Sequence, residues 1–184
     1  QQYMDAKEAC GDALLLFRMG DFYELFHEDA KIAAQALGLT LTSREKGENA
    51  IPMAGFPHHQ LDGYLGKLIK QGYRVAVCDQ VEDAKIAAKE NRQVKREIVS
   101  VLTPGTLTAD GMLKPRYNNY LAAVVIAKHH WGLSVADVST GEFLTTQDDD
   151  LDQLTQELMR LHPSEILYPT NAPDIGTMLR PGEN

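Results

Sequence analysis

Basic side chains are few in this chain of 184 residues, which has 18 Lys and Arg against 26 Asp and Glu and a net charge of −8. Because non-specific duplex binding rests mainly on contacts of Lys and Arg with phosphate, this balance argues against a broad basic DNA-binding face. It equally argues against a polybasic protein of membrane surfaces. No apolar run approaches the roughly 18 residues that a membrane-spanning helix needs. The hydrophobic content of 43% is that of an ordinary globular protein.

Cysteine and the common catalytic motifs are scarce or missing. The two cysteines, Cys10 and Cys78, form no CxxC pair, and no secretory signal opens the chain, so we expect a reducing, cytoplasmic setting. The six histidines show no HxxxH or HExxH spacing, which argues against a zinc site. The chain has no P-loop and no GxSxG nucleophile elbow. It lacks an initiator Met and ends abruptly, so we interpret it as a fragment of a longer protein.

The acidic excess is concentrated in the second part of the chain. Residues 1–100 carry 13 basic and 15 acidic side chains, whereas residues 101–184 carry 5 and 11. Within the first part, residues 84–96 hold five basic side chains and one acidic side chain. Such a short run is usually a solvated surface, and the functional alternative is a local patch that faces phosphate.

Hydrophobic periodicity predicts two regions of different type. Up to residue 102, predicted strands (13–18, 39–42, 73–78, 94–102) alternate with predicted helices (1–10, 21–37, 58–71, 83–91), as in an α/β domain. Between them, residues 43–50 are predicted as a polar loop and the stretch around residues 52–57 as turn-rich. Beyond residue 116, three predicted strands (120–127, 131–138, 142–146) form an antiparallel meander, followed by a helix (151–161) and a strand (165–168).

A strand, a glycine turn and a predicted helix meet at Asp21. Asp21 as N-cap and Glu24 three residues later form a capping-box pattern, which is a sufficient structural reason for Glu24. Phe22 would then stand at the first helical position, at the rim of the junction. An exposed ring beside a carboxylate is suited to recognition, although core packing is the more common fate of Phe.

Carboxylates in the meander suggest an alternative function. Asp137 lies within a predicted strand, with Glu142 across the hairpin and Asp148–Asp150 beyond it. Acids on neighbouring strands can hold two divalent metals for nuclease chemistry. Only Asp137 is well placed for such a site, so a metal-dependent nuclease centred on Asp137 is the second hypothesis. The acidic cluster is better explained by the positive N-terminus of the next helix.

Five sequence blocks, in the same order, resemble the MutS family of bacterial DNA mismatch repair proteins over essentially the whole chain. They are Arg18–Phe26 (RMGDFYELF), Ile51–His59 (IPMAGFPHH), Val77–Gln80 (VCDQ), Thr103–Thr106 (TPGT) and Asp137–Phe143 (DVSTGEF). The resemblance implies a mismatch-recognition domain of α/β class at residues 1–102, with a mixed sheet flanked by helices. It further implies a linker at residues 103–116 and, at residues 117–184, the truncated N-terminal part of an RNase H-like connector domain. Such a fold would explain the nuclease-like strand pattern without nuclease activity.

The resemblance also implies a site. In the family, the Phe of a Phe-x-Glu motif enters the minor groove and stacks on a mispaired base, and the Glu hydrogen-bonds to that base; the matching residues are Phe22 and Glu24. Other positions that match residues near the DNA are Met19, Met53, Pro57, His58 and Arg96.

The implied partner of this fragment is mismatched double-stranded DNA. The full-length protein would be a homodimer with a MutL-type partner, and it would bind ATP and Mg²⁺ in an ATPase domain outside this chain. We therefore expect no catalytic residue, no metal and no cofactor here, no membrane association, and no enzyme activity.

Overall fold

The computed structural model describes residues 1–43, 50–108 and 117–172. The chain divides into two compact units between Thr103 and Pro104, and each unit has its own sheet. Residues 104–107 of the predicted linker belong to the second unit, whereas residues 109–116 lie outside the described residues. Among the described residues, no helix is both long and apolar enough to span a membrane.

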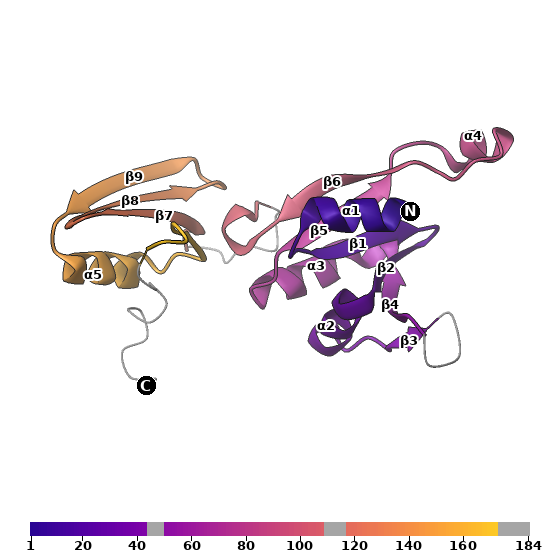
Figure 1. The fold of residues 1–184 in the computed structure, drawn as a ribbon, viewed down its shortest axis with the longest axis horizontal. Helices are drawn as coiled ribbons and strands as arrows, with labels where there is room; N and C mark the ends of the chain where they lie inside the picture. The colour runs from indigo at the N-terminus through magenta and orange to yellow at the C-terminus, as the bar shows by residue number, and fades with distance from the viewer. Residues whose placement is uncertain (44–49, 109–116, 173–184) are drawn as a thin grey trace. The chain divides into compact units, whose positions relative to one another are not determined.

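The first unit is built on a six-stranded mixed sheet in the order β3-β4-β2-β1-β5-β6 (Figure 1), which confirms the predicted α/β class. β1 pairs parallel with β5, and the other strand pairs are antiparallel. In chain order the elements are α1 (Gln2–Cys10), β1 (Leu14–Met19), β2 (Phe22–Phe26), α2 (His27–Leu37), β3 (Thr42–Ser43), β4 (Pro52–Pro57), η1 (His58–Gln60), α3 (Leu61–Lys70), β5 (Val75–Gln80), α4 (Ala84–Lys89) and β6 (Arg96–Leu102).

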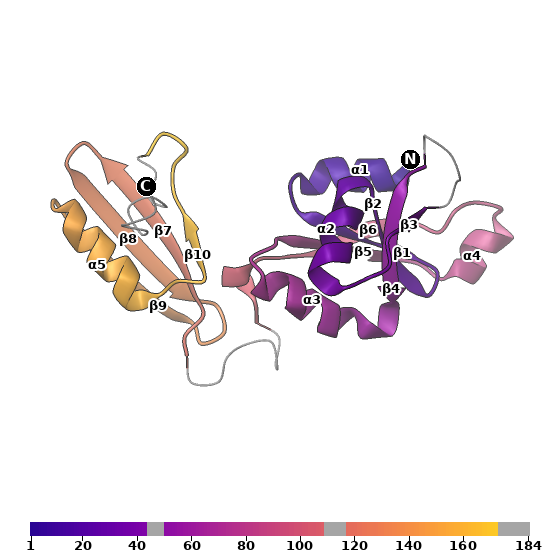
Figure 2. The ribbon, with the colours of Figure 1, turned by 90° about the horizontal axis from the view of Figure 1, so that it is seen from below.

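Helices cover both faces of this sheet. On one face, Tyr3 of α1 packs edge-on against Phe17 of β1, with ring centroids 5.5 Å apart. On the other face, Tyr64 of α3 lies against Phe56 of β4, with ring centroids 4.4 Å apart. Figure 2 shows α1 and α3 on opposite sides of the sheet. Because both faces are covered at the centre, β1 and β5 each begin with four consecutive buried residues.

The structure corrects the prediction of a helix that begins at Asp21. Residues 22–26 form strand β2, which returns antiparallel to β1 after the two-residue turn Gly20-Asp21, and α2 begins only at His27. The capping-box interpretation of Asp21 and Glu24 is therefore wrong. Burial alternates along β2, which is the period of a strand, and the predicted helical spacing holds only for the later part of the segment.

Strand β4 corrects a second prediction. Residues 52–57 are a strand in register with both β2 and β3, not a turn-rich stretch. Pro52 and Pro57 stand at its two ends, where the missing N–H disturbs the fewest ladder hydrogen bonds. The strand predicted at residues 39–42 is reduced to β3, which is two residues long.

The second unit has a four-stranded sheet in the order β10-β7-β8-β9 and the helix α5. Its elements are η2 (Pro104–Thr106), β7 (Tyr120–Ala127), β8 (His130–Asp137), β9 (Glu142–Asp148), α5 (Leu151–Leu161) and β10 (Glu165–Leu167). β7, β8 and β9 form the predicted antiparallel meander, and β10 pairs parallel with β7.

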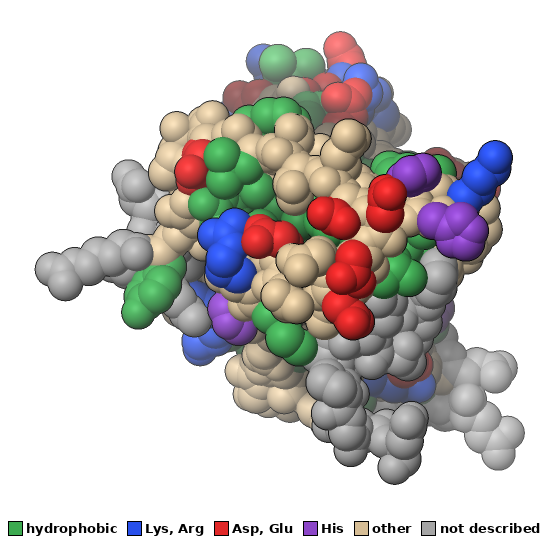
Figure 3. Space-filling model, turned by 90° about the vertical axis from the view of Figure 1, so that its left-hand side faces the viewer, with side chains coloured by type: hydrophobic (Ala, Val, Ile, Leu, Met, Phe, Trp, Pro, Cys, Tyr) green, Lys and Arg blue, Asp and Glu red, His purple; other side chains and the backbone are tan. Residues whose placement is uncertain are grey.

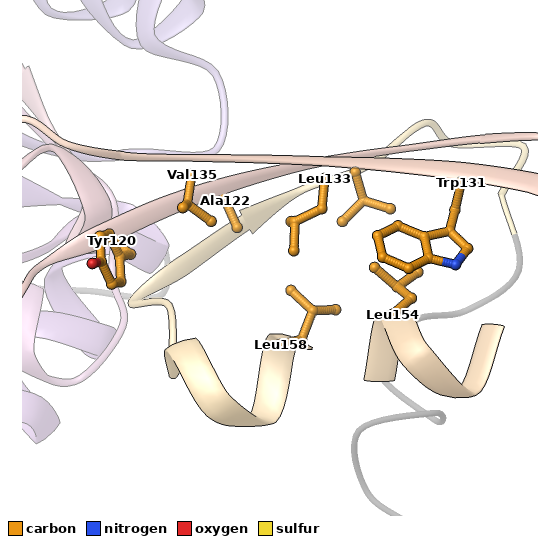
Figure 4. Close-up of a cluster of buried hydrophobic side chains, with 8 residues drawn as sticks. Tyr120, Ala122, Trp131, Leu133, Val135, Leu154 and Leu158 are labelled. Atoms are coloured by element: carbon orange, nitrogen blue, oxygen red, sulfur yellow. The ribbon is translucent and has the colours of Figure 1, made fainter. Parts of the chain in front are cut away.

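Helix α5 covers one face of the second sheet (Figure 4). Leu154 and Leu158 pack against Trp131, Leu133 and Val135 of β8. The Trp131 indole N–H donates to the carbonyl of Asp150 at 2.7 Å, so the polar atom of this buried ring has a partner. Trp131 is the only tryptophan in the chain, which makes its fluorescence a probe of this core.

Candidate functional site

The β1–β2 hairpin presents the residues that the sequence singled out. Met19 pairs with Phe22 across the two-residue turn Gly20-Asp21. Gly20 has a φ of +60° and Asp21 does not have a positive φ, which is the pattern of a type II′ turn with glycine in its first position. This tight turn leaves the Phe22 side chain at the end of the sheet, where it is 46% exposed.

Phe22 and Glu24 lie on the same face of β2, because they are two residues apart and successive strand side chains point to opposite faces. Tyr23 and Leu25 point to the other face and are buried. The alternation therefore separates two roles along five residues. Tyr23 and Leu25 belong to the core, Phe22 is exposed, and Glu24 and Phe26 are partly buried.

The neighbouring strands extend this face. Met19, Phe22 and Pro57 form one row across β1, β2 and β4. Glu24 lies in the next row, and Met53 of β4 lies in the row after it. The structure thus brings together Met19, Phe22, Glu24, Met53 and Pro57, which we call the hairpin face.

Gly55 is the neighbour of Glu24 on β4, and the sequence reasoning missed its structural role beside the candidate site. A Cβ atom at this position would lie 2.8 Å from the carbonyl oxygen of Tyr23 and 3.4 Å from Cγ of Glu24. Only glycine leaves room there for β2 and β4 to pair at their observed spacing. The signal in the sequence was a glycine within a run of strand length.

His58 and Arg96 differ from the hairpin face, because their polar atoms bind the hairpin backbone. The backbone N–H of His58 donates to the Asp21 carbonyl at 2.8 Å, and the ring Nδ1 lies 3.1 Å from the same oxygen. Arg96 Nε donates to the Arg18 carbonyl at 2.6 Å, and its Nη1 donates to the Val94 carbonyl at 2.9 Å. Both residues therefore touch the segment that carries Phe22.

A polar network lies behind the hairpin, on the face opposite Phe22. The Tyr23 hydroxyl donates to Asp79 at 2.8 Å, and Arg18 Nη1 lies 3.5 Å from the same carboxylate. Burial, and then the hydrogen bond to Asp79, raises the pKa of Tyr23 to about 12, so the phenol remains a donor at neutral pH. The sequence reasoning did not find this network, because its three members come from three strands, and β5 with Asp79 lies far in the chain from β1 and β2.

A hollow of about 630 Å³ adjoins the hairpin on the α1 side of the sheet. Its wall is partly aromatic and aliphatic, with Tyr3, Phe17, Met19 and Phe26 among the lining residues. Phe22 and Glu24 do not line it. The hollow therefore meets the hairpin face at Met19 and does not include Phe22 or Glu24.

The basic run at residues 84–96 is partly neutralised by its own neighbourhood. Arg92 binds Glu82 with Nη1 and Nη2 and also binds Glu90 with Nε. Lys95 Nζ lies 2.6 Å from Glu97. The charges of Arg92 and Lys95 are thus paired with neighbouring carboxylates, which makes this stretch less suited to binding phosphate.

Asp137 is a buried structural carboxylate in the second unit. One of its oxygens accepts from the backbone N–H of Asn119 at 2.9 Å, and the other accepts from Ser139 Oγ at 2.6 Å and from the backbone N–H groups of Ser139 and Thr140. Within residues 1–43, 50–108 and 117–172, no three His, Cys, Asp or Glu side chains are grouped closely enough to hold a metal ion. No observation in this part of the chain favours the nuclease alternative.

Acidic side chains gather on the second unit. Figure 3 looks onto this unit, and more acidic than basic side chains are visible on the face shown. Asp148 at the end of β9 is exposed, as are Asp149 and Asp150 between β9 and α5. The Asp148 carboxylate accepts from the two backbone N–H groups that follow it, and Asp150 caps α5 by accepting from the N–H of Asp152 at 2.9 Å. The cluster is thus explained by the start of the helix.

Two family models match this chain. The one described as MutS domain I matches residues 1–111, and the one described as MutS domain II matches residues 119–180. Over 185 residues the chain is 64% identical to the DNA mismatch repair protein MutS of Trichodesmium erythraeum, and over 184 residues it is 58% identical to that of Trichormus variabilis. Both alignments cover 100% of this chain, which spans about a fifth of the length of these curated relatives.

Proposed function

The chain belongs to the MutS family, and on that premise we propose that its first unit recognises mispaired or unpaired bases in duplex DNA by inserting Phe22 from the minor groove. The observation that carries the proposal is the exposed ring of Phe22 at the end of a tight hairpin, with the Glu24 carboxylate on the same face. Met19, Met53 and Pro57 would lie against the groove around them.

The energetics favour a defect over a paired duplex. Wedging a ring between base steps costs a few kcal/mol of unstacking. A mispaired or unpaired base is already weakly stacked, so this cost is lower there, and stacking on an aromatic ring returns on the order of 1–3 kcal/mol per base. Discrimination then comes largely from deformability, which suits a site that must accept many different mispairs.

Glu24 would add selectivity through repulsion. A carboxylate close to phosphates disfavours binding unless a base offers it a hydrogen bond, so it penalises the well-paired duplex more than the mispaired one. Where the base atom facing Glu24 is an acceptor, the acid must be protonated to donate.

The charge of the first unit is suited to selectivity for a mispair more than to high affinity for the DNA backbone. Residues 1–103 carry 13 basic and 15 acidic side chains, so this unit does not hold duplex DNA by charge alone. We propose that in the full-length protein other domains supply most of the contacts with the DNA backbone. There the chain would function as a homodimer with a MutL-type partner, and ATP and Mg²⁺ would bind in an ATPase domain.

Titration of this chain against two labelled duplexes, identical except for one mispair, tests the proposal by fluorescence anisotropy at about 50 and 200 mM salt. We expect weak binding, with tighter binding to the mispaired duplex at both salt concentrations. Equal affinity for the two duplexes would contradict the proposed function. Metal-dependent cleavage of either duplex, abolished by Asp137→Ala, would instead support the nuclease alternative.

A further inference from the structure

We propose that Arg96, together with Arg18 and His58, positions the β1–β2 hairpin for mismatch recognition, and that Arg96 does not itself bind phosphate. This inference rests on the proposed function, because it concerns how Phe22 is held. It assigns to Arg96 a role that its charge alone does not suggest.

Three carbonyl groups at the hairpin end, those of Arg18, Gly20 and Asp21, each accept a hydrogen bond from a side chain or from the backbone. The Arg18 carbonyl accepts from Arg96 Nε, the Gly20 carbonyl accepts from Arg18 Nε, and the Asp21 carbonyl accepts from His58. These donors come from β6, from β1 and from η1, so three separate elements hold one turn. A hairpin end held by these three hydrogen bonds is pre-organised, so little ordering remains to be done when the ring is inserted into a base stack.

Two of the three guanidinium nitrogens of Arg96, Nε and Nη1, make hydrogen bonds within the first unit. Besides its bonds to Arg18 and Val94, its Nη1 lies 3.5 Å from the side-chain oxygen of Gln2. Its guanidinium carbon lies 5.4 Å from the centroid of the Phe17 ring. A phosphate would have to compete for Nε and Nη1, which leaves it Nη2 of a side chain that is only partly exposed.

Arg96 also supports the strand opposite Glu24. Phe17, which Arg96 covers, is the cross-strand neighbour of Glu24 in the β1–β2 register. On the reverse face, Tyr23 and Arg18 are tied to Asp79 of β5. The hairpin is therefore held from both faces, and Phe22 and Glu24 lie on the same face as Phe17 and its contact with Arg96.

The substitution Arg96→Lys separates positioning from phosphate binding, because lysine keeps the charge but loses the planar fork that reaches two carbonyl groups and covers a ring. If Arg96 positions the hairpin, the preference for mispaired over paired duplex falls on the order of tenfold, as expected for the loss of a charged hydrogen bond. The dependence of affinity on salt stays unchanged, because the number of phosphate contacts is the same.

A phosphate-binding Arg96 would behave in the opposite way. Arg96→Lys would keep the preference, and Arg96→Gln would weaken binding to both duplexes about equally and lower the salt slope by about 1. That outcome would overturn the inference. Arg74→Lys is the matched control, because Arg74 forms an exposed ion pair with Asp12. Arg74 directly precedes β5, and the first residue of β5 pairs with Leu14, at the end of β1 that is far from the hairpin.

Arg18→Lys provides a second variant, because it removes the donor to the Gly20 carbonyl without touching Arg96. We expect it to lower the mismatch preference as well, with the circular dichroism spectrum and the salt slope unchanged. If the unsubstituted chain prefers the mispaired duplex and both variants keep that preference, the positioning role is wrong and the proposed function stands. If the unsubstituted chain shows no preference, the proposed function itself fails and this inference with it.

Discussion

Phe22 is an aromatic side chain whose removal should affect binding more than folding. Its ring is 46% exposed, so Phe22→Ala should change the free energy of unfolding by no more than about 0.5 kcal/mol, as for other surface substitutions. Binding to a mispaired duplex should weaken by about 1–3 kcal/mol, the value of one aromatic–base stack, and binding to the paired duplex should stay the same. Thermal unfolding followed by circular dichroism, together with anisotropy titrations, measures both quantities.

Phe143→Ala is the matched control for this substitution. Phe143 is 65% exposed on β9 of the second unit, so it tests the loss of an exposed phenyl ring that does not belong to the first unit. It should change neither stability nor mismatch preference. A sharp fall in the melting temperature of Phe22→Ala would show that the ring belongs to the core and would contradict its role as a wedge.

Glu24 should affect discrimination through its charge. Glu24→Gln keeps the size and the hydrogen-bonding capacity but removes the negative charge, so binding to the paired duplex should tighten and the preference for the mispaired duplex should fall. The change should be larger at low salt, where the repulsion from phosphates is least screened. Titrations of both duplexes at two salt concentrations measure it, and an unchanged preference would contradict the charge argument.

Asp137 makes the stability of the second unit depend on pH. Burial alone would raise its pKa, but the hydrogen bonds from Ser139, Asn119 and Thr140 outweigh this and hold the pKa below its usual range. Since the folded pKa lies below the unfolded one, the carboxylate stabilises the unit above the unfolded pKa of about 3.9, and this stabilisation is lost as the pH falls through the folded pKa.

Asp137→Asn should therefore lower the free energy of unfolding of this unit by about 1–3 kcal/mol at neutral pH, because an amide cannot accept all four hydrogen bonds. The difference should shrink in acid, where the native carboxyl group is itself protonated. Denaturant unfolding followed by Trp131 fluorescence measures it. An equal loss at neutral and acid pH would contradict the ionic explanation.

At the level of elements, the pairing of β2 with β4 depends on Gly55. A Cβ at this position would lie 2.8 Å from backbone, so Gly55→Ala must push the two strands apart and should cost about 1–3 kcal/mol, as overpacking does. Gly63→Ala is the control of opposite sign, because Gly63 in α3 has no atom within 4 Å of an added Cβ and alanine is favoured in helices by about 1 kcal/mol. Urea unfolding compares the two, and equal stability would show that β4 can shift freely.

The elements also show where sequence reasoning succeeds and where it does not. Residues 151–161 were predicted as a helix and form α5, because their spacing has a single period and a clear cap. Residues 21–26 were assigned to a helix, because the apolar residues of β2 run without a break into those of α2. Two signals in this segment point instead to a hairpin. Tyr23 and Leu25 alternate with less buried residues, as in a strand, and Gly20-Asp21 is suited to a two-residue hairpin turn.

At the level of the whole molecule, the candidate site could be predicted from resemblance but not from periodicity. The Phe-x-Glu match identifies Phe22 and Glu24 as the candidate pair. The structure places them on one face because they lie two residues apart on strand β2, whereas the sequence pattern predicts the start of a helix there. The bonds from Arg96 to Arg18, and from Tyr23 to Asp79, join residues more than fifty positions apart. Such contacts depend on strand order, which no local pattern contains.

The uneven charge of the chain leads to a prediction about the two units. Residues 104–184 carry 5 basic and 11 acidic side chains. A chain of residues 1–103 therefore loses most of the net negative charge but keeps Phe22 and Glu24. It should bind both duplexes a few-fold more tightly than the full chain at low salt, where charges act over about 30 Å, and equally well at high salt. The ratio of the two affinities should stay the same. Anisotropy titrations of both chains across a salt series measure this, and a changed ratio would show that the second unit takes part in discrimination.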